Sequence, residues 1–397
     1  MDPYLNEWLS FLLRWLHVVA GIVWIGTSFY FVALDNHLDP PREPLDEREG
    51  VGGESWEIHG GGFYRVQKFR VAPRRLPEPL HWFKWEAYTT WLSGFALLVV
   101  LYYVNADTYL VDRSVLDLRP WQAIATSVSL LVVAWLVYDV LARVVASEQL
   151  FAVLLLGLVA ASAYGVSNLY SGRATYLQIG AMLGTIMVAN VFFVIIPGHW
   201  QLVRAKEAGR EPDPIHGIRG KQRSVHNNYL TLPVVFAMLA GHFPSAYGAR
   251  HGWAILVGFV AVGAAIRHYF NLRHRGVNAW PIPLAAGLVL LGIGLAARPG
   301  DTGVTTRPGP PVAFARVEAI VGQRCVPCHS AHPSRAGYAA APLGIELDEA
   351  AQIAAQADAI RRVAVDSRAM PLGNATGMTE DERAVLGRWL AQGAHVK

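Results

Sequence analysis

Cysteine and charge are both scarce in this chain of 397 residues, which has two cysteines and only 16% charged residues. Two cysteines are too few for a disulfide framework, so the fold must depend on apolar packing. The formal net charge of +4 is small for this length and gives no basis for nucleic-acid binding. Apolar side chains are abundant instead, at 53% of the residues, and they occur in long runs.

Several of these runs are long enough to cross a lipid bilayer, which takes about 20 residues in a helix. Eight segments qualify, near 11–34, 86–105, 121–142, 149–170, 177–200, 229–246, 252–272 and 280–297. Tryptophan and tyrosine crowd many of their ends, which is typical of membrane interfaces. We therefore predict an all-α fold in which an eight-helix polytopic membrane domain, residues 1–298, precedes a small helical domain.

Basic residues predict the orientation of this domain. Lys and Arg gather in the loop 35–85 and in the loop between the fifth and sixth segments, whereas the alternate loops hold few. The positive-inside rule makes the two basic loops cytoplasmic, and eight spans then leave both termini outside. The first segment follows an acidic start and has no small-residue cleavage site, so we expect it to be retained.

The pentapeptide Cys325-Val326-Pro327-Cys328-His329 holds both cysteines and indicates covalent attachment of a c-type haem. Each thiol can form a thioether to one vinyl group of the same porphyrin, and His329 then becomes an axial ligand of the iron. A zinc site would need further ligands at short spacing, and a redox disulfide normally begins a helix within a βαβ unit. Both alternatives stay open but fit less well.

The sequence around this motif predicts a complete small domain over residues 312–397. Short helices are expected at 317–324 and about 379–392, the second opened by a capping box at Thr379. Met370, before Pro371, is the expected sixth ligand of the haem iron, and Met378 is the competing methionine. The segment resembles class I cytochromes c. Residues 299–311, rich in Pro and Gly, are predicted to be a linker.

Histidines within the apolar segments suggest a second haem. His17 lies in the first segment and His242 at the outer end of the sixth, so the pair could ligate a b-type haem. Interhelical hydrogen bonding is the alternative explanation for such polar groups.

A second group of polar residues points to the cytoplasmic side: Asn190, His199, His226, Asn227, Asn228, Arg267 and His268. Together these residues could line a cavity open to the cytosol, although snorkelling at the interface explains some of them equally well. In the loop 35–85, His59 precedes three glycines that would let the backbone approach a ligand, or would simply form a turn packed on the membrane face.

Three stretches carry a more specific resemblance: Trp56 to Tyr64, His81 to Tyr88, and His226 to Pro233. With the order of the two domains, they resemble the bacterial membrane-bound urate oxidases, also called urate hydroxylases, over essentially the whole chain. The resemblance implies oxidation of urate to 5-hydroxyisourate in purine breakdown, with electrons leaving through the cytochrome. It also implies a multi-pass protein of the bacterial inner membrane with a periplasmic cytochrome domain.

For the urate site we expect His226, Asn227, Asn228, Arg267 and His268, closed by the His59 loop, with Glu86 or a histidine as the base. The electron acceptor would be a soluble or membrane cytochrome, or a terminal oxidase. Two rival functions remain: a quinol- or oxygen-linked respiratory cytochrome that does not act on urate, and an electron shuttle or transporter with a regulatory cytochrome.

Overall fold

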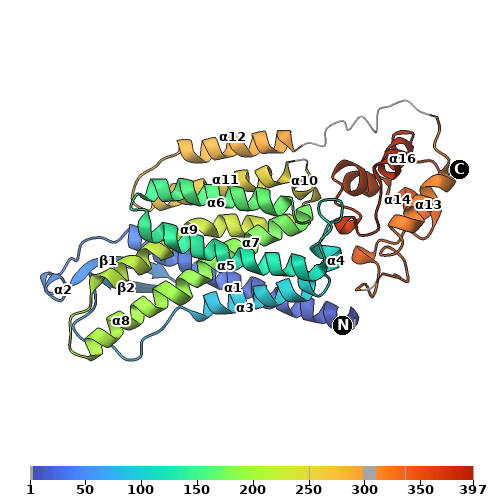
Figure 1. Ribbon diagram of the computed structural model, residues 1–397. Coiled ribbons are helices and arrows are strands. Elements are labelled where there is room, and N and C mark those ends of the chain that lie inside the picture. Colours follow the sequence, from blue (N-terminus) through green and yellow to red (C-terminus); the bar gives the residue numbers. More distant parts are fainter. Residues whose placement is uncertain (1–2, 250, 298–309, 336, 397) are drawn as a thin grey trace.

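The computed structural model describes residues 3–249, 251–297, 310–335 and 337–396. A bundle of long helices occupies most of the chain, and a smaller helical unit, residues 310–396, lies at one end of it (Figure 1). The N-terminus lies at the same end of the bundle as this unit (Figure 1). Most of the predicted linker, residues 299–309, falls outside the described residues.

The bundle is built from helical units that coincide with the eight predicted apolar segments. They are α1 (Pro3–Asn36), α3 (Trp85–Leu97) continued by η1 (Leu98–Tyr103), α5 (Pro120–Val144), α6 (Glu148–Ser167), α7 (Gly172–Asn190) continued by η2 (Val191–Ile195) and α8 (Ile196–Glu207), α9 (Pro214–Leu239) with η3 (Ala240–His242), α11 (Gly252–Arg273) and α12 (Pro281–Ala296).

Five helices among the described residues are long and apolar enough to cross a membrane: α1, α5, α6, the continuous α7–η2–α8 and α11. Helix α12 is apolar but shorter, and α9 starts with polar turns. The positions of the eight segments were therefore predicted correctly as helices, while length and composition support membrane crossing for five of them.

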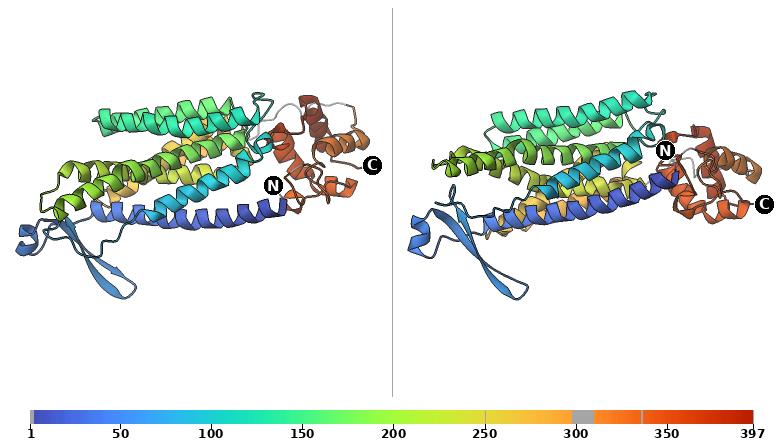
Figure 2. Two further views of the ribbon diagram at one scale, coloured as in Figure 1. Left: turned by 60° about the horizontal axis from the view of Figure 1, so that its bottom comes forward. Right: turned by 90° about the horizontal axis from the view of Figure 1, so that it is seen from below.

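The all-α prediction is wrong for residues 51–69, which form an antiparallel hairpin of β1 (Val51–His59) and β2 (Gly62–Phe69). Its two-residue turn is Gly60-Gly61, and both glycines have positive φ, as the tight turns of hairpins require. The hairpin stands away from the bundle at the end opposite the C-terminal unit (Figure 2). Short helix α2 (Pro44–Arg48) precedes it.

Helix α9 is central to the bundle because it packs against α1, α7, α8 and α11. Its approach to α11 is close at Gly263, where a Cβ would lie 3.1 Å from the ring of Pro233. Gly263 is one turn before Arg267 on α11, so the small residue brings the polar part of α9 against the arginine.

The C-terminal unit has its own apolar core around Val317, Leu386 and Trp389. Its principal helices are α13 (Phe314–Arg324) and α16 (Glu380–Ala391), and the capping box of Thr379 and Glu382 is present as predicted. Between them lie η4 (Pro342–Gly344), α14 (Ala350–Ala355), α15 (Ala357–Ile360), η5 (Arg361–Asp366) and η6 (Leu372–Asn374). At the facing end of the bundle are α4 (Ala106–Tyr109) and α10 (Pro244–Tyr247).

Candidate functional site

One stretch of α9 buries an unusual series of polar side chains. Arg223, His226, Asn227, Asn228 and Thr231 are each at most 6% exposed. Consecutive residues of a helix point about 100° apart, so Asn227 and Asn228 face different neighbouring helices. The series therefore forms two polar groups, one on each side of α9.

The first group surrounds Arg267 of α11, which is only 4% exposed. Its Nε donates to Asn228 Oδ1 at 2.8 Å, its Nη2 donates to Asn271 Oδ1 at 3.2 Å, and Asn271 Nδ2 donates to the same Asn228 oxygen at 3.1 Å. The guanidinium also lies over the ring of Phe29 of α1, 3.9 Å from its centroid. The two amides and the ring hold the arginine in place.

No carboxylate of the described residues forms an ion pair with Arg267. The Nδ2 of Asn228 beside it is buried without a hydrogen-bond partner. An unpaired buried cation is costly, and a donor left without an acceptor adds to the cost. An anionic ligand with hydrogen-bond acceptor atoms would neutralise the charge of Arg267 and accept a hydrogen bond from Asn228 Nδ2.

A cavity of about 50 Å³ lies beside this group and is bordered by Val32, Tyr229, His268 and Asn271. Tyr229 and His268 close it on one side through a 2.7 Å hydrogen bond between the phenol and Nδ1. His268 is exposed, so this pair separates the buried arginine from the surface of the bundle.

The second group is a chain of hydrogen bonds through His226. Its Nδ1 lies 2.8 Å from the hydroxyl of Tyr138 on α5, and its Nε2 lies 3.2 Å from Glu148 Oε2 at the start of α6. Asn190 of α7 donates its amide to the Tyr138 oxygen at 2.8 Å and to Asn227 Oδ1 at 3.0 Å. The Tyr138 proton can therefore point to Nδ1, leaving the Nε2 proton for the carboxylate.

This chain connects the interior with the surface. Tyr138 and Asn190 are fully buried, whereas the side chain of Glu148 is 61% exposed. The ring of Phe151 stacks on His226 at 4.3 Å, which fixes the imidazole plane. A carboxylate, an imidazole and a phenol in series can move a proton out of the bundle.

A buried ion pair supports the second group. Arg223 Nη2 lies 2.7 Å from Asp139 Oδ1, and the guanidinium sits over the Tyr138 ring at 5.1 Å from its centroid. The sequence analysis did not select Tyr138, Asp139, Glu148 or Asn271. Asp139 had a usable signal, because an acidic residue within an apolar segment is costly unless it is paired.

Two predicted site residues lie apart from these groups. His59 is exposed at the end of the hairpin, which stands away from the bundle (Figure 2). Glu86 is half-buried in the first turn of α3, where its Oε2 has no hydrogen-bond partner. The structure thus divides the other predicted residues between the two groups: Asn228, Arg267 and His268 lie between α9 and α11, whereas His226 and Asn227 face α5 and α7.

The histidines considered for a second haem have separate surroundings. His17 of α1 hydrogen-bonds through Nδ1 to the carbonyl oxygen of Thr90 at 2.9 Å and lies 3.3 Å from the Ser93 hydroxyl, both on α3. Its ring packs on Gly94. His242 is exposed at the end of α9. The contacts of His17 are therefore the interhelical hydrogen bonds that the sequence left as the alternative.

In the C-terminal unit, the pentapeptide Cys325 to His329 begins where α13 ends. Both thiols are half-buried, and burial raises the pKa of Cys325 to about 12 and also raises the pKa of Cys328. His329 Nδ1 donates to the carbonyl oxygen of Ile345 at 3.0 Å, which orients the ring and leaves Nε2 free as a ligand atom.

The two methionines differ in burial. Met370 is half-buried, and its carbonyl oxygen accepts a 2.8 Å hydrogen bond from Arg383. Met378 is 3% exposed within the apolar core. The side chain that remains partly accessible is thus Met370.

Comparison with known proteins gives one match. A family model described as "Urate oxidase N-terminal" matches residues 3–297, which is the helical bundle. No curated protein and no solved structure matches the chain. The match covers most of the sequence and includes α9 and α11. The chain therefore belongs to the urate oxidase N-terminal family, whose name implies an oxidoreductase of urate chemistry.

Proposed function

We propose that this protein is a membrane-bound oxidoreductase that converts urate to 5-hydroxyisourate and delivers the electrons to a c-type haem held by its C-terminal unit. The observation that carries the proposal is Arg267, a buried arginine that pairs with no carboxylate of the described residues and lies inside the region matched by the urate oxidase family. Urate is a planar anion at neutral pH, with carbonyl acceptors and N–H donors at its edge. It would meet the guanidinium and the amides of Asn228 and Asn271.

Access to this group requires a movement. A cavity of about 50 Å³ has room for a water molecule, whose share of liquid volume is about 30 Å³, but not for a purine. The hydrogen-bonded pair of Tyr229 and His268 forms part of the cavity wall, and His268 is exposed at the surface. We expect this pair to separate when urate binds and to close behind it.

The reaction releases protons that the second polar group can accept. Urate and one water give 5-hydroxyisourate, two electrons and two protons. In this proposal His226, on the opposite side of α9 from Arg267, acts as a proton relay: it is oriented by Tyr138 and hydrogen-bonded to Glu148, and the partly exposed Glu148 passes the proton to solvent. Glu86 is the second candidate for the base, but its Oε2 has no hydrogen-bond partner that would lead a proton to solvent.

The C-terminal unit has the groups that a covalent haem needs. Cys325 and Cys328 would carry the thioethers, His329 would ligate the iron through Nε2, and Met370 would be the sixth ligand. The free Nε2 of His329 and the accessible Met370 side chain fit this assignment. A haem bound there supplies a one-electron acceptor. His17 and His242 stay secondary candidates for a b-type haem, which would require His17 to give up its contacts with α3.

The proposed location is the bacterial inner membrane. The five helices that are long and apolar enough to cross it support a membrane location. The basic residues of the loop 35–85 support a cytoplasmic hairpin, which leaves the C-terminal unit, at the opposite end of the bundle (Figure 2), on the periplasmic side. From there the electrons would continue to a soluble or membrane cytochrome, or to a terminal oxidase.

Anaerobic addition of urate to the purified oxidised protein tests the proposal. The haem absorption bands should change to those of the ferrous state, with two haems reduced per urate consumed and 5-hydroxyisourate formed. Adenine, a neutral purine, is the control and should give no reduction. A respiratory cytochrome that does not act on urate would stay oxidised with urate and be reduced by a quinol.

A further inference from the structure

The C-terminal unit contacts the bundle through a small defined surface, which we call the docking seat: residues 105–111 and Gly248. Arg335 Nη2 donates to Thr108 Oγ1 of the seat at 3.3 Å. Ala369, from the C-terminal unit, is 7% exposed and belongs to the apolar core of the bundle. The two units are therefore packed together at this surface.

Glycines permit the close approach. A Cβ on Gly373 would lie 2.6 Å from the carbonyl oxygen of Val111, and a Cβ on Gly248 would overlap the carbonyl oxygen of Ser367. Gly248 has a φ of −87°, which any residue adopts, so its backbone conformation does not require glycine. A Cβ there would meet both the carbonyl oxygen of Ser367 and, at 2.8 Å, the carbonyl oxygen of Pro244 in its own turn.

The docked side of the C-terminal unit is the side that carries the haem-binding motif. The backbone N–H of Arg335 donates to Pro327, between the two cysteines, at 2.9 Å. Ala369 directly precedes Met370, and Gly373 follows it by three residues. Segments adjoining both proposed iron ligands thus rest on the bundle.

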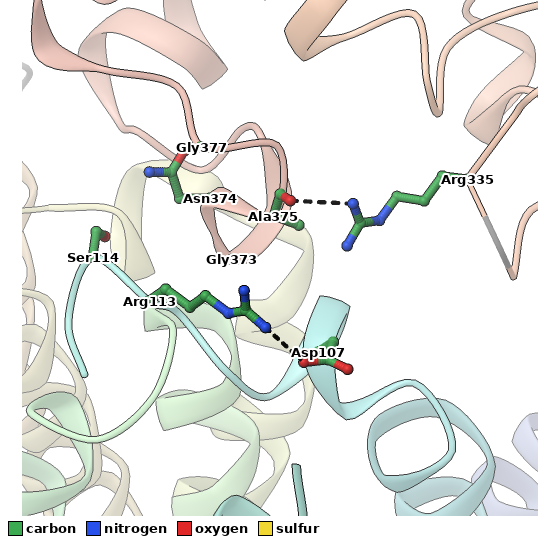
Figure 3. Close-up of a pocket in the computed structure, with 8 residues that line it drawn as sticks. All are labelled: Asp107, Arg113, Ser114, Arg335, Gly373, Asn374, Ala375 and Gly377. Atoms are coloured by element: carbon green, nitrogen blue, oxygen red, sulfur yellow. Dashed lines mark hydrogen bonds and ion pairs between the residues drawn. The ribbon is translucent and has the colours of Figure 1, made fainter. Parts of the chain in front are cut away.

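A cavity of about 580 Å³ lies within this junction, between Arg335 and residues 373–377 on one side and Asp107, Arg113 and Ser114 on the other (Figure 3). On the wall from the C-terminal unit, Arg335 donates a hydrogen bond to the carbonyl oxygen of Ala375 at 3.1 Å. On the wall from the bundle, Arg113 forms an ion pair with Asp107 at 3.4 Å (Figure 3).

Two tyrosines meet across the junction. Burial raises the pKa of Tyr338 in the C-terminal unit, and Tyr109 of the seat acts on it in the same direction. Tyr109 in turn lies 5.8 Å, between ring centroids, from the buried Tyr102 of η1. The ring contact of Tyr109 with Tyr102 therefore connects the seat with the interior of the bundle.

We propose that the docking seat is the junction through which electrons pass from the bundle to the haem site, with Tyr109 and Tyr338 as the positioning contact. This inference rests on the proposed function. Each urate supplies two electrons, which cross one at a time, and each converts one ferric haem to ferrous. No bond forms or breaks at the junction, and the protons do not cross it, because in the proposed function they leave through His226 and Glu148.

Opening the seat in the full-length protein tests the inference. Gly248→Val should displace Ser367, although its Cβ would also press on the carbonyl oxygen of Pro244 in the same turn. Gly165→Val is the control because nothing lies within 4 Å of a Cβ there. Hydrogen exchange of residues 105–111 reports opening, and Gly248→Trp enlarges the displacement if valine is accommodated. Stopped-flow absorption then compares haem reduction by urate with reduction by dithionite, which needs no junction.

We expect the rate of haem reduction by urate to fall about tenfold in the open-seat variant. Forcing a side chain into a packed contact disfavours the docked state, and the cost of such overpacking corresponds to about this factor in the docked population. Reduction by dithionite should keep its rate, as should both reactions in Gly165→Val. Tyr338→Phe keeps the ring and should stay within about twofold of the wild type, because it removes only one modest hydrogen bond. An open seat with an unchanged rate of reduction by urate would overturn the inference alone. Failure of urate to reduce the wild-type haem would instead overturn the proposed function.

Discussion

Replacing Arg267 by methionine should weaken urate binding strongly and change stability little. The two expectations come from the same observation, namely that the guanidinium is buried and has only neutral partners, Asn228 and Asn271. Replacing buried charged groups by apolar chains of similar volume is neutral or stabilises by about 1–4 kcal/mol where ion pairs are replaced, and the same sign is expected for this unpaired charge. Leaving Asn271 Oδ1 without its donor costs about 1–3 kcal/mol. The two contributions oppose each other, so the free energy of unfolding should change little.

For urate binding, the loss of Arg267 has no opposing contribution. Hydrogen bonds to a charged group are worth about 1.5–3 kcal/mol, which corresponds to a rise of about 10- to 100-fold in the half-saturating urate concentration. Arg267→Lys should fall between wild type and methionine, because lysine keeps the charge but cannot make the paired contacts. The assay is anaerobic haem reduction as a function of urate concentration, together with a thermal unfolding curve of each variant.

Arg273→Met, an exposed arginine of the same helix, is the control for loss of one positive charge. Wild-type urate dependence in a folded Arg267→Met protein would refute the assignment of the anion site. Loss of urate response together with a large fall in the unfolding temperature would show that the arginine is structural.

Other predictions address the remaining groups. Cys325→Ser with Cys328→Ser should abolish haem-linked peroxidase staining on a denaturing gel while the bundle still inserts into membranes; staining that persists would contradict covalent attachment. Met370→His should remove the methionine-to-iron absorption band and lower the reduction potential, whereas Met378→Leu should do neither, and the reverse result would transfer the ligand role to Met378. Glu148→Gln should lower the rate of haem reduction by about 10²- to 10⁴-fold if proton transfer limits the reaction, at an unchanged half-saturating urate concentration; an unchanged rate would exclude the chain through His226.

The positions of the long helices followed from the sequence because each depends on a local property, an uninterrupted apolar run. The hairpin at 51–69 did not, although its cross-strand pairs include Trp56 with Arg65 and Ile58 with Phe63. Its exposed half mixes polar and apolar residues on both strands, so the period-two pattern of a half-buried strand is weak there. Gly60-Gly61 was the usable signal, since glycine pairs favour a tight hairpin turn.

The candidate site also has a part that could be predicted from the sequence and a part that could not. Asn228 and Arg267 were predicted because polar residues in apolar segments are costly and therefore informative. Their partners could not be chosen from the sequence, since Asn228 is 39 positions from Arg267, and Tyr138 is 88 positions from His226. Such contacts depend on how helices pack. For the same reason the sequence could not decide whether His17 faces a haem or a neighbouring helix; the helix packing places its ring against Gly94 of α3.

The two polar groups explain why a single helix carries so many costly residues. Anion binding needs a cation that is not already neutralised, whereas proton removal needs a base with a path to solvent, and a carboxylate close to the arginine would defeat the first requirement. Helix α9 separates the two: Asn228 faces Arg267 of α11, while His226 and Asn227 face α5 and α7. The acidic groups, Asp139 and Glu148, are paired with Arg223 and His226 on that second side. In this proposal the charge of Arg267 therefore remains available to urate, and the proton leaves by the other face of α9.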